Sequence, residues 1–165
     1  MTSEHLLHTI PPIYDGNSKI LILGSFPSVK SREVSFYYGH PQNRFWRVLA
    51  AVLGCAVPSS NEEKTALLQS HNIALWDVIK SCDIVGSSDS SIKNVVPNDI
   101  GVILSSCGIS QIYSNGKTSE KLFNKYIKDT VGRDTVALPS TSPANASYNL
   151  ERLTDSWSVI KNNIR

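Results

Sequence analysis

A run of four apolar residues, ILIL at positions 20–23, is followed at once by Gly24 and Ser25. Strands that are buried on both faces read as continuous apolar runs, whereas strands with one face in water alternate apolar and polar residues. The run therefore predicts an interior strand of a parallel sheet that is covered on both faces and delivers its carboxyl end to a loop.

Helical and strand-like patterns alternate along the rest of the chain. From Asn43, apolar residues recur every three or four positions until Gly54, which predicts a helix with a glycine stop. Further helices are predicted over residues 61–70, 97–106, 118–128 and from Leu150 onward, and further strands over residues 73–79, 109–116 and 134–140. Residues 81–99 are polar and rich in serine, so we predict a long loop there. The alternation of strands and helices indicates an α/β fold with a parallel sheet.

Length, charge and cysteine usage limit the classes of protein that fit. The 165 residues are 41% apolar, with no internal repeat, so we expect one globular domain, residues 1–165. A formal charge of only +2 means that any nucleic-acid contact must be local. The three cysteines never occur in CxxC spacing, which argues against a zinc or iron–sulfur site. With no leader-like start and no run of membrane-spanning length, we expect a cytoplasmic protein.

Three predicted strand ends meet at one edge of the sheet, and their sequences are GSFPS, SNGKTS and LPSTSPANA. Ligands of parallel α/β sheets bind beyond the carboxyl ends of the strands, so these segments form the candidate site. None of them is a GxGxxG or GxxxxGK(S/T) phosphate loop, which argues against a nucleotide cofactor. Ser25 or Ser28 could serve a small-molecule hydrolase, but no GxSxG elbow and no partnered acid and base mark either residue.

Aromatic and amide side chains near these ends suit a flat heterocyclic base. Phe26 and the tyrosines of SFYYGHPQNRFWRVL, residues 35–49, could stack on such a base, or equally could close the hydrophobic core. Of the adjacent Tyr37 and Tyr38, we expect one to pack inward and the other to stay available. The Asn43 amide both donates and accepts, so it fits a base edge or a bound water, and alternatively the cap of the following helix.

The other two strand ends offer further candidates with their own alternatives. Asn115 precedes Gly116, so it could read a base edge or simply form a turn. The hydroxyls and free amides of residues 140–142 suit phosphate oxygens, and alternatively form a capping turn at the next helix. The Asn115 side chain could equally point into a pocket shared with Asn43.

Taken in order, the segments GSFPS, YYGHPQNRFWRVL, GSSDSSI, SNGKTSEKLF and LPSTSPAN resemble the motifs of the uracil-DNA glycosylase superfamily. The combination of GSFPS with YYGHPQNRFW is most similar to its hypoxanthine-DNA glycosylase branch, and the resemblance runs from Lys19 to the last helix. It implies a three-layer α/β/α sandwich with a central, mainly parallel sheet of four to five strands. It also implies a monomeric, monofunctional enzyme of base excision repair that needs no metal and no cofactor.

The reaction that the resemblance implies is hydrolysis of an N-glycosidic bond in DNA. The enzyme flips a deaminated base out of the duplex, chiefly hypoxanthine, with uracil and xanthine as further candidates. In many relatives an Asp or Asn at the third position of the first motif orients the water, and here that position is Phe26. The resemblance therefore assigns catalysis to Asn43. It assigns the base pocket to Ser25, Phe26, Tyr37, Tyr38 and Asn115, and the contacts to DNA to Ser28, Ser140, Ser142 and Asn145.

Two departures from the superfamily pattern leave alternatives open. The missing acidic residue in GSFPS also fits a non-catalytic module that binds damaged DNA. Ala144 stands where many relatives carry a bulky wedge, and an alanine cannot fill the gap left by a flipped base. We therefore expect a preference for weakly paired or single-stranded lesions.

Overall fold

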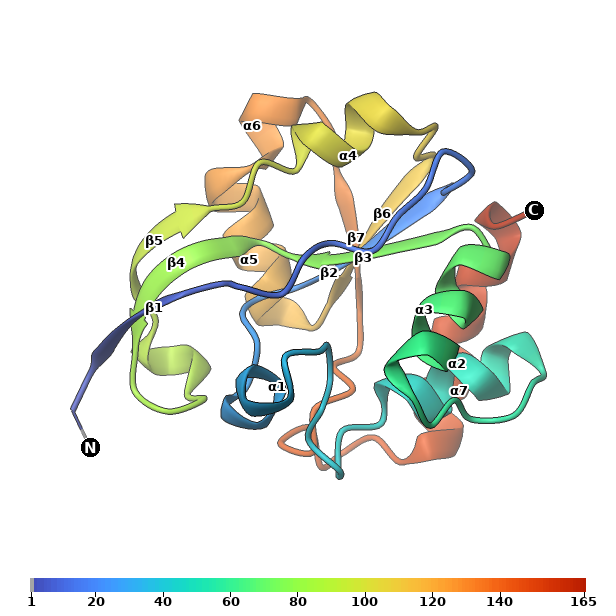
Figure 1. The fold of residues 1–165 in the computed structure, drawn as a ribbon, viewed down its shortest axis with the longest axis horizontal. Coiled ribbons are helices and arrows are strands. Elements are labelled where there is room, and N and C mark those ends of the chain that lie inside the picture. Colours follow the sequence, from blue (N-terminus) through green and yellow to red (C-terminus); the bar gives the residue numbers. More distant parts are fainter. Residues whose placement is uncertain (1) are drawn as a thin grey trace.

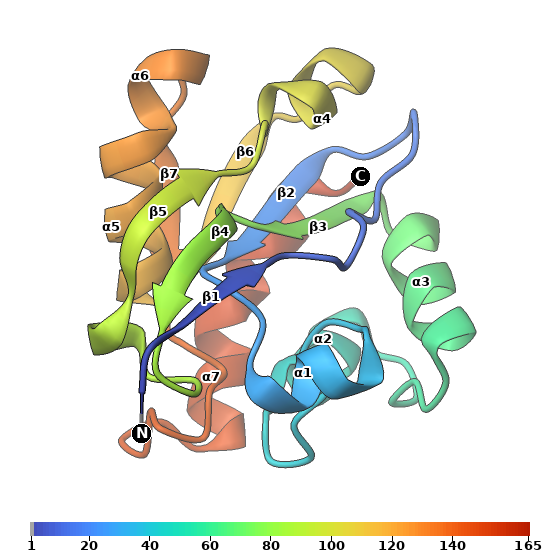
Figure 2. The ribbon, with the colours of Figure 1, turned by 60° about the vertical axis from the view of Figure 1, so that its left-hand side comes forward.

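A parallel four-stranded sheet forms the centre of the protein, which a computed structural model describes over residues 2–165 (Figures 1 and 2). Its strand order is β3-β2-β6-β7. The strands are β2 (Ile20–Gly24), β3 (Ile73–Asp77), β6 (Gln111–Asn115) and β7 (Thr135–Leu138). All three neighbouring pairs are parallel, and every residue of β2 is buried. The predicted interior strand and the predicted parallel sheet are thus confirmed.

The side chains of β2 alternate between two hydrophobic clusters, one on each face of the sheet. Ile20 and Ile22 pack into the cluster beneath α2 (Phe45–Leu53), α3 (Asn61–Ser70) and α7 (Leu150–Trp157). Leu21 and Leu23 pack into the opposite cluster, with α4 (Gly101–Ser106) and α5 (Lys117–Tyr126). Figure 1 shows these helix groups on either side of the strands, so the sheet is the middle of three layers.

Short elements complete the chain. They are α1 (Val29–Val34), η1 (Asp89–Ser91), α6 (Lys128–Val131) and η2 (Ser158–Asn163). Gly54 ends α2 with a φ of 70°, a left-handed conformation that glycine adopts without steric cost, as its position predicts. Within residues 2–165 no helix has the length and apolar content needed to cross a bilayer.

The long loop predicted for residues 81–99 is wrong. This region holds most of β4 (Ile79–Ile84) and all of β5 (Lys93–Pro97), which pair with β1 (Glu4–Leu7) in an antiparallel sheet of order β1-β4-β5. Ile79, Cys82 and Ile84 of β4 pack into the second cluster. Lys80 is exposed, and the β4–β5 register shifts twice. Strand residues make up about half of this region, and the connection between the two strands, residues 85–92, holds most of its serines.

Candidate functional site

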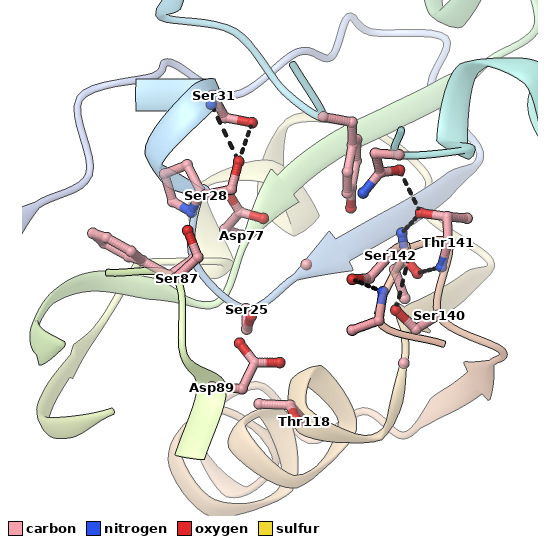
Figure 3. A pocket seen from close by; sticks show the side chains of 18 of the residues that line it. Ser25, Ser28, Ser31, Asp77, Ser87, Asp89, Thr118, Ser140, Thr141 and Ser142 are labelled. Atoms are coloured by element: carbon pink, nitrogen blue, oxygen red, sulfur yellow. Dashed lines mark hydrogen bonds between the residues drawn. The ribbon is translucent and has the colours of Figure 1, made fainter. Parts of the chain in front are cut away.

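A cavity of about 380 Å³ opens at the carboxyl ends of the four parallel strands (Figure 3). The sheet register places Gly24 beside Asp77, and Asn115 beside Leu138, so the strand ends lie at one level. The walls come from five parts of the chain: residues 24–31, 37–43, 77–89, 115–118 and 140–144. Segments far apart in sequence thus meet at the edge that the strand pattern predicts.

Asn43 is held in one orientation by two donors. Its Oδ1 accepts hydrogen bonds from the Phe45 backbone N–H and from the Thr141 hydroxyl, both at 2.9 Å. A backbone N–H can only donate, so the oxygen end of the amide is fixed toward the helix. The Nδ2 group is the end left for the cavity that Asn43 lines. The side chain therefore assists the start of α2 and presents a donor to the pocket.

Thr141 connects Asn43 to Asn115. Asn115 Nδ2 donates to the Thr141 hydroxyl at 3.0 Å, and Asn115 Oδ1 accepts from the Thr141 backbone N–H at 3.0 Å. Thr141 is fully buried, so its hydroxyl is an internal link between the two amides. The sequence analysis grouped the Thr141 hydroxyl with those of its neighbours as a candidate for phosphate oxygens, and it missed the link because only the fold brings Thr141 to both asparagines.

Three aromatic side chains line the cavity, and they differ in burial: Tyr37 is buried, whereas Tyr38 and Phe26 are partly exposed. Tyr37 is 2% exposed and its hydroxyl donates to the Pro11 carbonyl at 2.8 Å. Tyr38 has a φ of 53°, which is uncommon for a residue with a side chain, and its ring stacks on Phe45 at 4.2 Å between centroids. Phe26 is partly buried in the second cluster, and its ring edge lies against His8. Tyr37, Tyr38 and Phe26 all line the cavity.

Burial raises the pKa of both tyrosines far above the ordinary value, and the negative charge of Asp77 is the next cause in each case. Both hydroxyls therefore stay protonated at neutral pH. The Tyr38 hydroxyl is buried and forms no hydrogen bond of ordinary geometry within residues 2–165, although the Asn115 side chain lies close enough to lower its pKa, so the hydroxyl proton is free to bond to a ligand of the cavity.

The serine hydroxyls mostly serve the local backbone. Ser28 Oγ accepts from the Ser31 N–H at 3.2 Å and begins α1, while Ser31 Oγ accepts from the Gly39 N–H at 2.9 Å. Ser28 therefore caps α1, and its hydroxyl is not paired with a general base as a serine nucleophile would be. Figure 3 shows Ser28 and Ser31 on one side of the cavity and the last motif on the other, with Ser25 between them.

The last motif, LPSTSPAN, is a compact loop that is held by hydrogen bonds between its own residues. Ser140 Oγ accepts from the Ser142 N–H at 3.1 Å, Ser142 Oγ accepts from the Ala144 N–H at 3.2 Å, and Asn145 Nδ2 donates to the Ser140 carbonyl at 3.0 Å. Ser140 and Ser142 line the cavity, whereas Asn145 supports the loop from outside it. The alternative of a capping turn at the next helix is wrong, because Asn149 caps α7, whereas these hydroxyls form turns within the loop and line the cavity wall.

Comparison with known proteins agrees with this geometry. Residues 11–162 match the family model described as the uracil DNA glycosylase superfamily. The chain belongs to this superfamily. It is 36% identical over 137 residues to a hypoxanthine DNA glycosylase of Methanosarcina barkeri (strain Fusaro / DSM 804), a match that covers 82% of this chain and 85% of the relative.

A curated relative and a solved structure from Methanosarcina acetivorans are also similar to this superfamily member. A hypoxanthine DNA glycosylase is 34% identical over 152 residues, which cover 91% of this chain and 94% of the relative. The solution NMR structure of a uracil DNA glycosylase candidate superposes with a TM-score of 0.78 at 32% identity, and covers 92% of this chain and 94% of the other. The resemblance inferred from the motifs and the predicted fold class are confirmed.

Arg44 is a second residue that the sequence analysis missed in this superfamily member. Its guanidinium donates to the backbone carbonyls of Tyr148, of Ser142 at 2.8 Å and of Asn145 at 3.1 Å. Its backbone N–H also donates to the Thr141 carbonyl at 3.1 Å. The start of α2 thereby holds the last motif in place, next to Asn43.

We expect Arg44→Lys to loosen this loop, since an ammonium group cannot reach several carbonyls with the planar fork of a guanidinium. Hydrogen bonds to charged groups contribute about 1.5–3 kcal/mol each, so amides of residues 141–148 should exchange with solvent roughly ten- to a hundredfold faster. Hydrogen exchange followed by mass spectrometry measures this. Arg47→Lys is the matched control, because Arg47 lies on the same helix but is exposed. Equal protection of the loop in both variants would contradict the role.

Within residues 2–165 no group of three or more His, Cys, Asp or Glu side chains could hold a metal ion. The polar residues that line this superfamily member's cavity instead carry amides, hydroxyls, the carboxylates of Asp77 and Asp89, and the ammonium group of Lys117. Asp77 escaped the sequence analysis because residues 73–79 read as one strand. In the structure β3 ends at Asp77 and β4 begins at Ile79, so Asp77 is itself a strand end.

Proposed function

We propose that this protein is a monofunctional DNA glycosylase that hydrolyses the N-glycosidic bond of deaminated bases, chiefly hypoxanthine. The names of its two relatives and its membership of the superfamily support this activity. The observation that carries the assignment of the site is the fixed Asn43 amide, whose Nδ2 donor faces a cavity of about 380 Å³. A cavity of this size accommodates one flipped base.

The base would bind between aromatic and amide groups at the strand ends. Tyr38 is the tyrosine that we place beside the base, because the Tyr37 hydroxyl is already bound to the Pro11 carbonyl. Phe26 would contact the base from the end of β2, and Ser25 and Asn115 would reach its polar edge. Such contacts offset the few kcal/mol that it costs to unstack a base.

Asn43 would act on the departing base. Hypoxanthine carries acceptors at O6 and N7, and the electron pair of the broken bond makes these atoms more negative as the base leaves. A fixed N–H donor binds this developing charge more strongly than the neutral base, so it lowers the barrier. Adenine carries an amino donor in place of O6, which gives the Asn43 donor a poorer match.

The loop of residues 140–145 would lie against the DNA backbone. Ser140 and Ser142 offer hydroxyls at the cavity wall, Ser28 lies across from them, and Asn145 keeps the loop in shape. Ala144 is exposed at the rim and has no bulk to replace a flipped base in the stack. We therefore propose that weakly paired and single-stranded lesions are the better substrates.

Oligonucleotides carrying one deoxyinosine, single-stranded, opposite C or opposite T, test this function. We expect release of free hypoxanthine, an abasic site that breaks only after alkali, and faster release from the less stable substrates. Deoxyuridine and deoxyxanthosine oligonucleotides rank the other bases. A strand break without alkali would contradict the monofunctional assignment. Binding with no release at a large excess of protein would instead identify a damage-binding module.

A further inference from the structure

Asp77 places a carboxylate at the floor of the cavity. It ends β3, is only 4% exposed and lines the cavity. Its Oδ2 accepts a hydrogen bond from His8 Nε2 at 2.7 Å, and the His8 side chain is 1% exposed. His8 is not among the residues that line the cavity, so it holds the Asp77 carboxylate from the side away from the cavity. Burying this pair is costly, and stability alone does not account for a carboxylate at this point.

The other oxygen of the carboxylate lies beside Gly24 and near the Tyr38 hydroxyl. A Cβ added at Gly24 would lie 2.4 Å from Asp77 Oδ1 and 3.0 Å from Tyr38 Oη. Glycine is therefore required at the end of β2, since only its bare Cα lets both oxygens approach. The two oxygens lie on the same side of Gly24, and neither is bonded to the other because Tyr38 Oη has no partner within residues 2–165.

An acceptor, Asp77 Oδ1, and a donor, the Tyr38 hydroxyl, thus lie beside the same part of the cavity, next to Gly24. Leaving a buried hydroxyl without a partner costs about 1–3 kcal/mol, so Tyr38 Oη points to a ligand of the cavity. Oδ1 can only accept when the carboxylate is ionised, whereas the protonated Tyr38 hydroxyl can donate. A water molecule satisfies both groups at once. Phe26, at the end of the same strand as Gly24, has no polar atom that could take part.

We propose that Asp77 is a second catalytic residue, which binds and activates the attacking water, and that His8 is its positioning residue. This inference rests on the proposed glycosylase function. The water oxygen forms a bond to C1′ of the flipped nucleotide while the C1′–N9 bond breaks, and the electron pair of that bond leaves with the base. One proton of the water passes to Asp77 Oδ1 and from there to the departing base or solvent. One water is consumed, and the products are free hypoxanthine and an abasic sugar.

The charge of Asp77 has a second effect in this reaction. The sugar becomes positive as the bond to the base breaks, and a nearby carboxylate stabilises that charge in a site with little water. His8 donates to Oδ2 and leaves Oδ1 for the water. Asn43 then acts on the leaving group, which is the base, and Asp77 acts on the nucleophile, which is the water.

Asp77→Asn tests the inference, because asparagine keeps the shape and an acceptor but loses the charge. We expect the single-turnover rate of hypoxanthine release to fall roughly a hundredfold, with the Kd for deoxyinosine DNA and the thermal midpoint nearly unchanged. Asp83→Asn is the matched control. Asp83 also accepts from a histidine, His5, at 2.7 Å, but its side chain is 29% exposed and lies outside the cavity. Its release rate should equal that of the wild type.

A second variant, His8→Gln, carries the test if Asp77→Asn does not fold. Glutamine keeps an N–H donor but sets the carboxylate less firmly, so the release rate should fall roughly tenfold or more at an unchanged Kd. Wild-type rates in the folded Asp77→Asn variant, or in His8→Gln if it alone folds, would overturn the inference. If the wild type itself releases no hypoxanthine, the proposed function fails. If the wild type is active and these variants match it, only the role of Asp77 and His8 fails.

Discussion

Replacing Asn43 by alanine should slow hypoxanthine release from deoxyinosine DNA by about 10²–10³-fold. The variant loses the Nδ2 donor that we place against the departing base, and loss of one such donor typically costs this much in the rate of the chemical step. It also loses the acceptor of the Phe45 N–H and of the Thr141 hydroxyl. Single-turnover measurements with excess protein isolate the chemical step from binding and product release.

Asn43→Asp separates the two functions of the side chain. Aspartate still accepts from Phe45 and Thr141, so α2 keeps its cap, but it turns an oxygen instead of an N–H group toward the base. We expect the same loss of rate with nearly full stability. Asn149→Ala is the converse control, because Asn149 Oδ1 caps α7 by accepting from the Arg152 N–H at 2.8 Å outside the cavity. That variant should lose about 1 kcal/mol of stability and keep its rate. An active Asn43→Asp variant would reduce Asn43 to a cap.

Trp157→Ala should destabilise the protein by about 3–5 kcal/mol, a large share of the 5–15 kcal/mol that typically holds a domain folded. Trp157 is 1% exposed on α7, and its ring packs edge-on against Phe45 of α2 at 5.9 Å between centroids. Its Nε1 donates to the carbonyl of Pro139, in the last motif, at 2.9 Å. The substitution leaves a cavity and an unpaired carbonyl. Urea unfolding at constant temperature measures the difference.

Leu150→Ala provides the control for this measurement, since Leu150 lies on the same helix but is 40% exposed. Its cost should be a small fraction of that of Trp157→Ala. Trp157→Phe retains much of the ring volume but not the Nε1 donor, so its cost should fall between those of the other two variants. Similar unfolding free energies for Trp157→Ala and Leu150→Ala would show that α7 is not held by this residue.

The strong, local patterns of the sequence predict the central sheet well. The apolar run of residues 20–23 is sufficient to identify β2 because a strand buried on both faces has no polar positions. Gly54 marks the end of α2 because few other residues adopt its left-handed conformation readily. Residues 81–99 fail this kind of reasoning, since the two short strands have a shifted register, contain polar residues such as Asp83 and Lys93, and are joined by a serine-rich connection. Their polar composition resembles that of a loop.

The site is predicted in part for a related reason. Strand ends can be located from sequence, so the placement of Asn43, Asn115 and the last motif near one cavity follows from the parallel sheet. Thr141 and Arg44 act through contacts between positions about a hundred residues apart, and no local pattern encodes such a contact. Asp77 was hidden because a single residue, Val78, separates β3 from β4, and two strands so close together read as one.

The link from Asn115 through Thr141 to Asn43 also determines when the protein can become active during its synthesis. Asn43 leaves the ribosome early, but the hydroxyl that fixes its amide follows 98 residues later. A nascent chain with the first strands and α2 already in place therefore still lacks an oriented Asn43. An oriented Asn43 should arise only after the last motif has been synthesised and has docked together with α7. Incomplete chains would then be unable to create abasic sites in DNA.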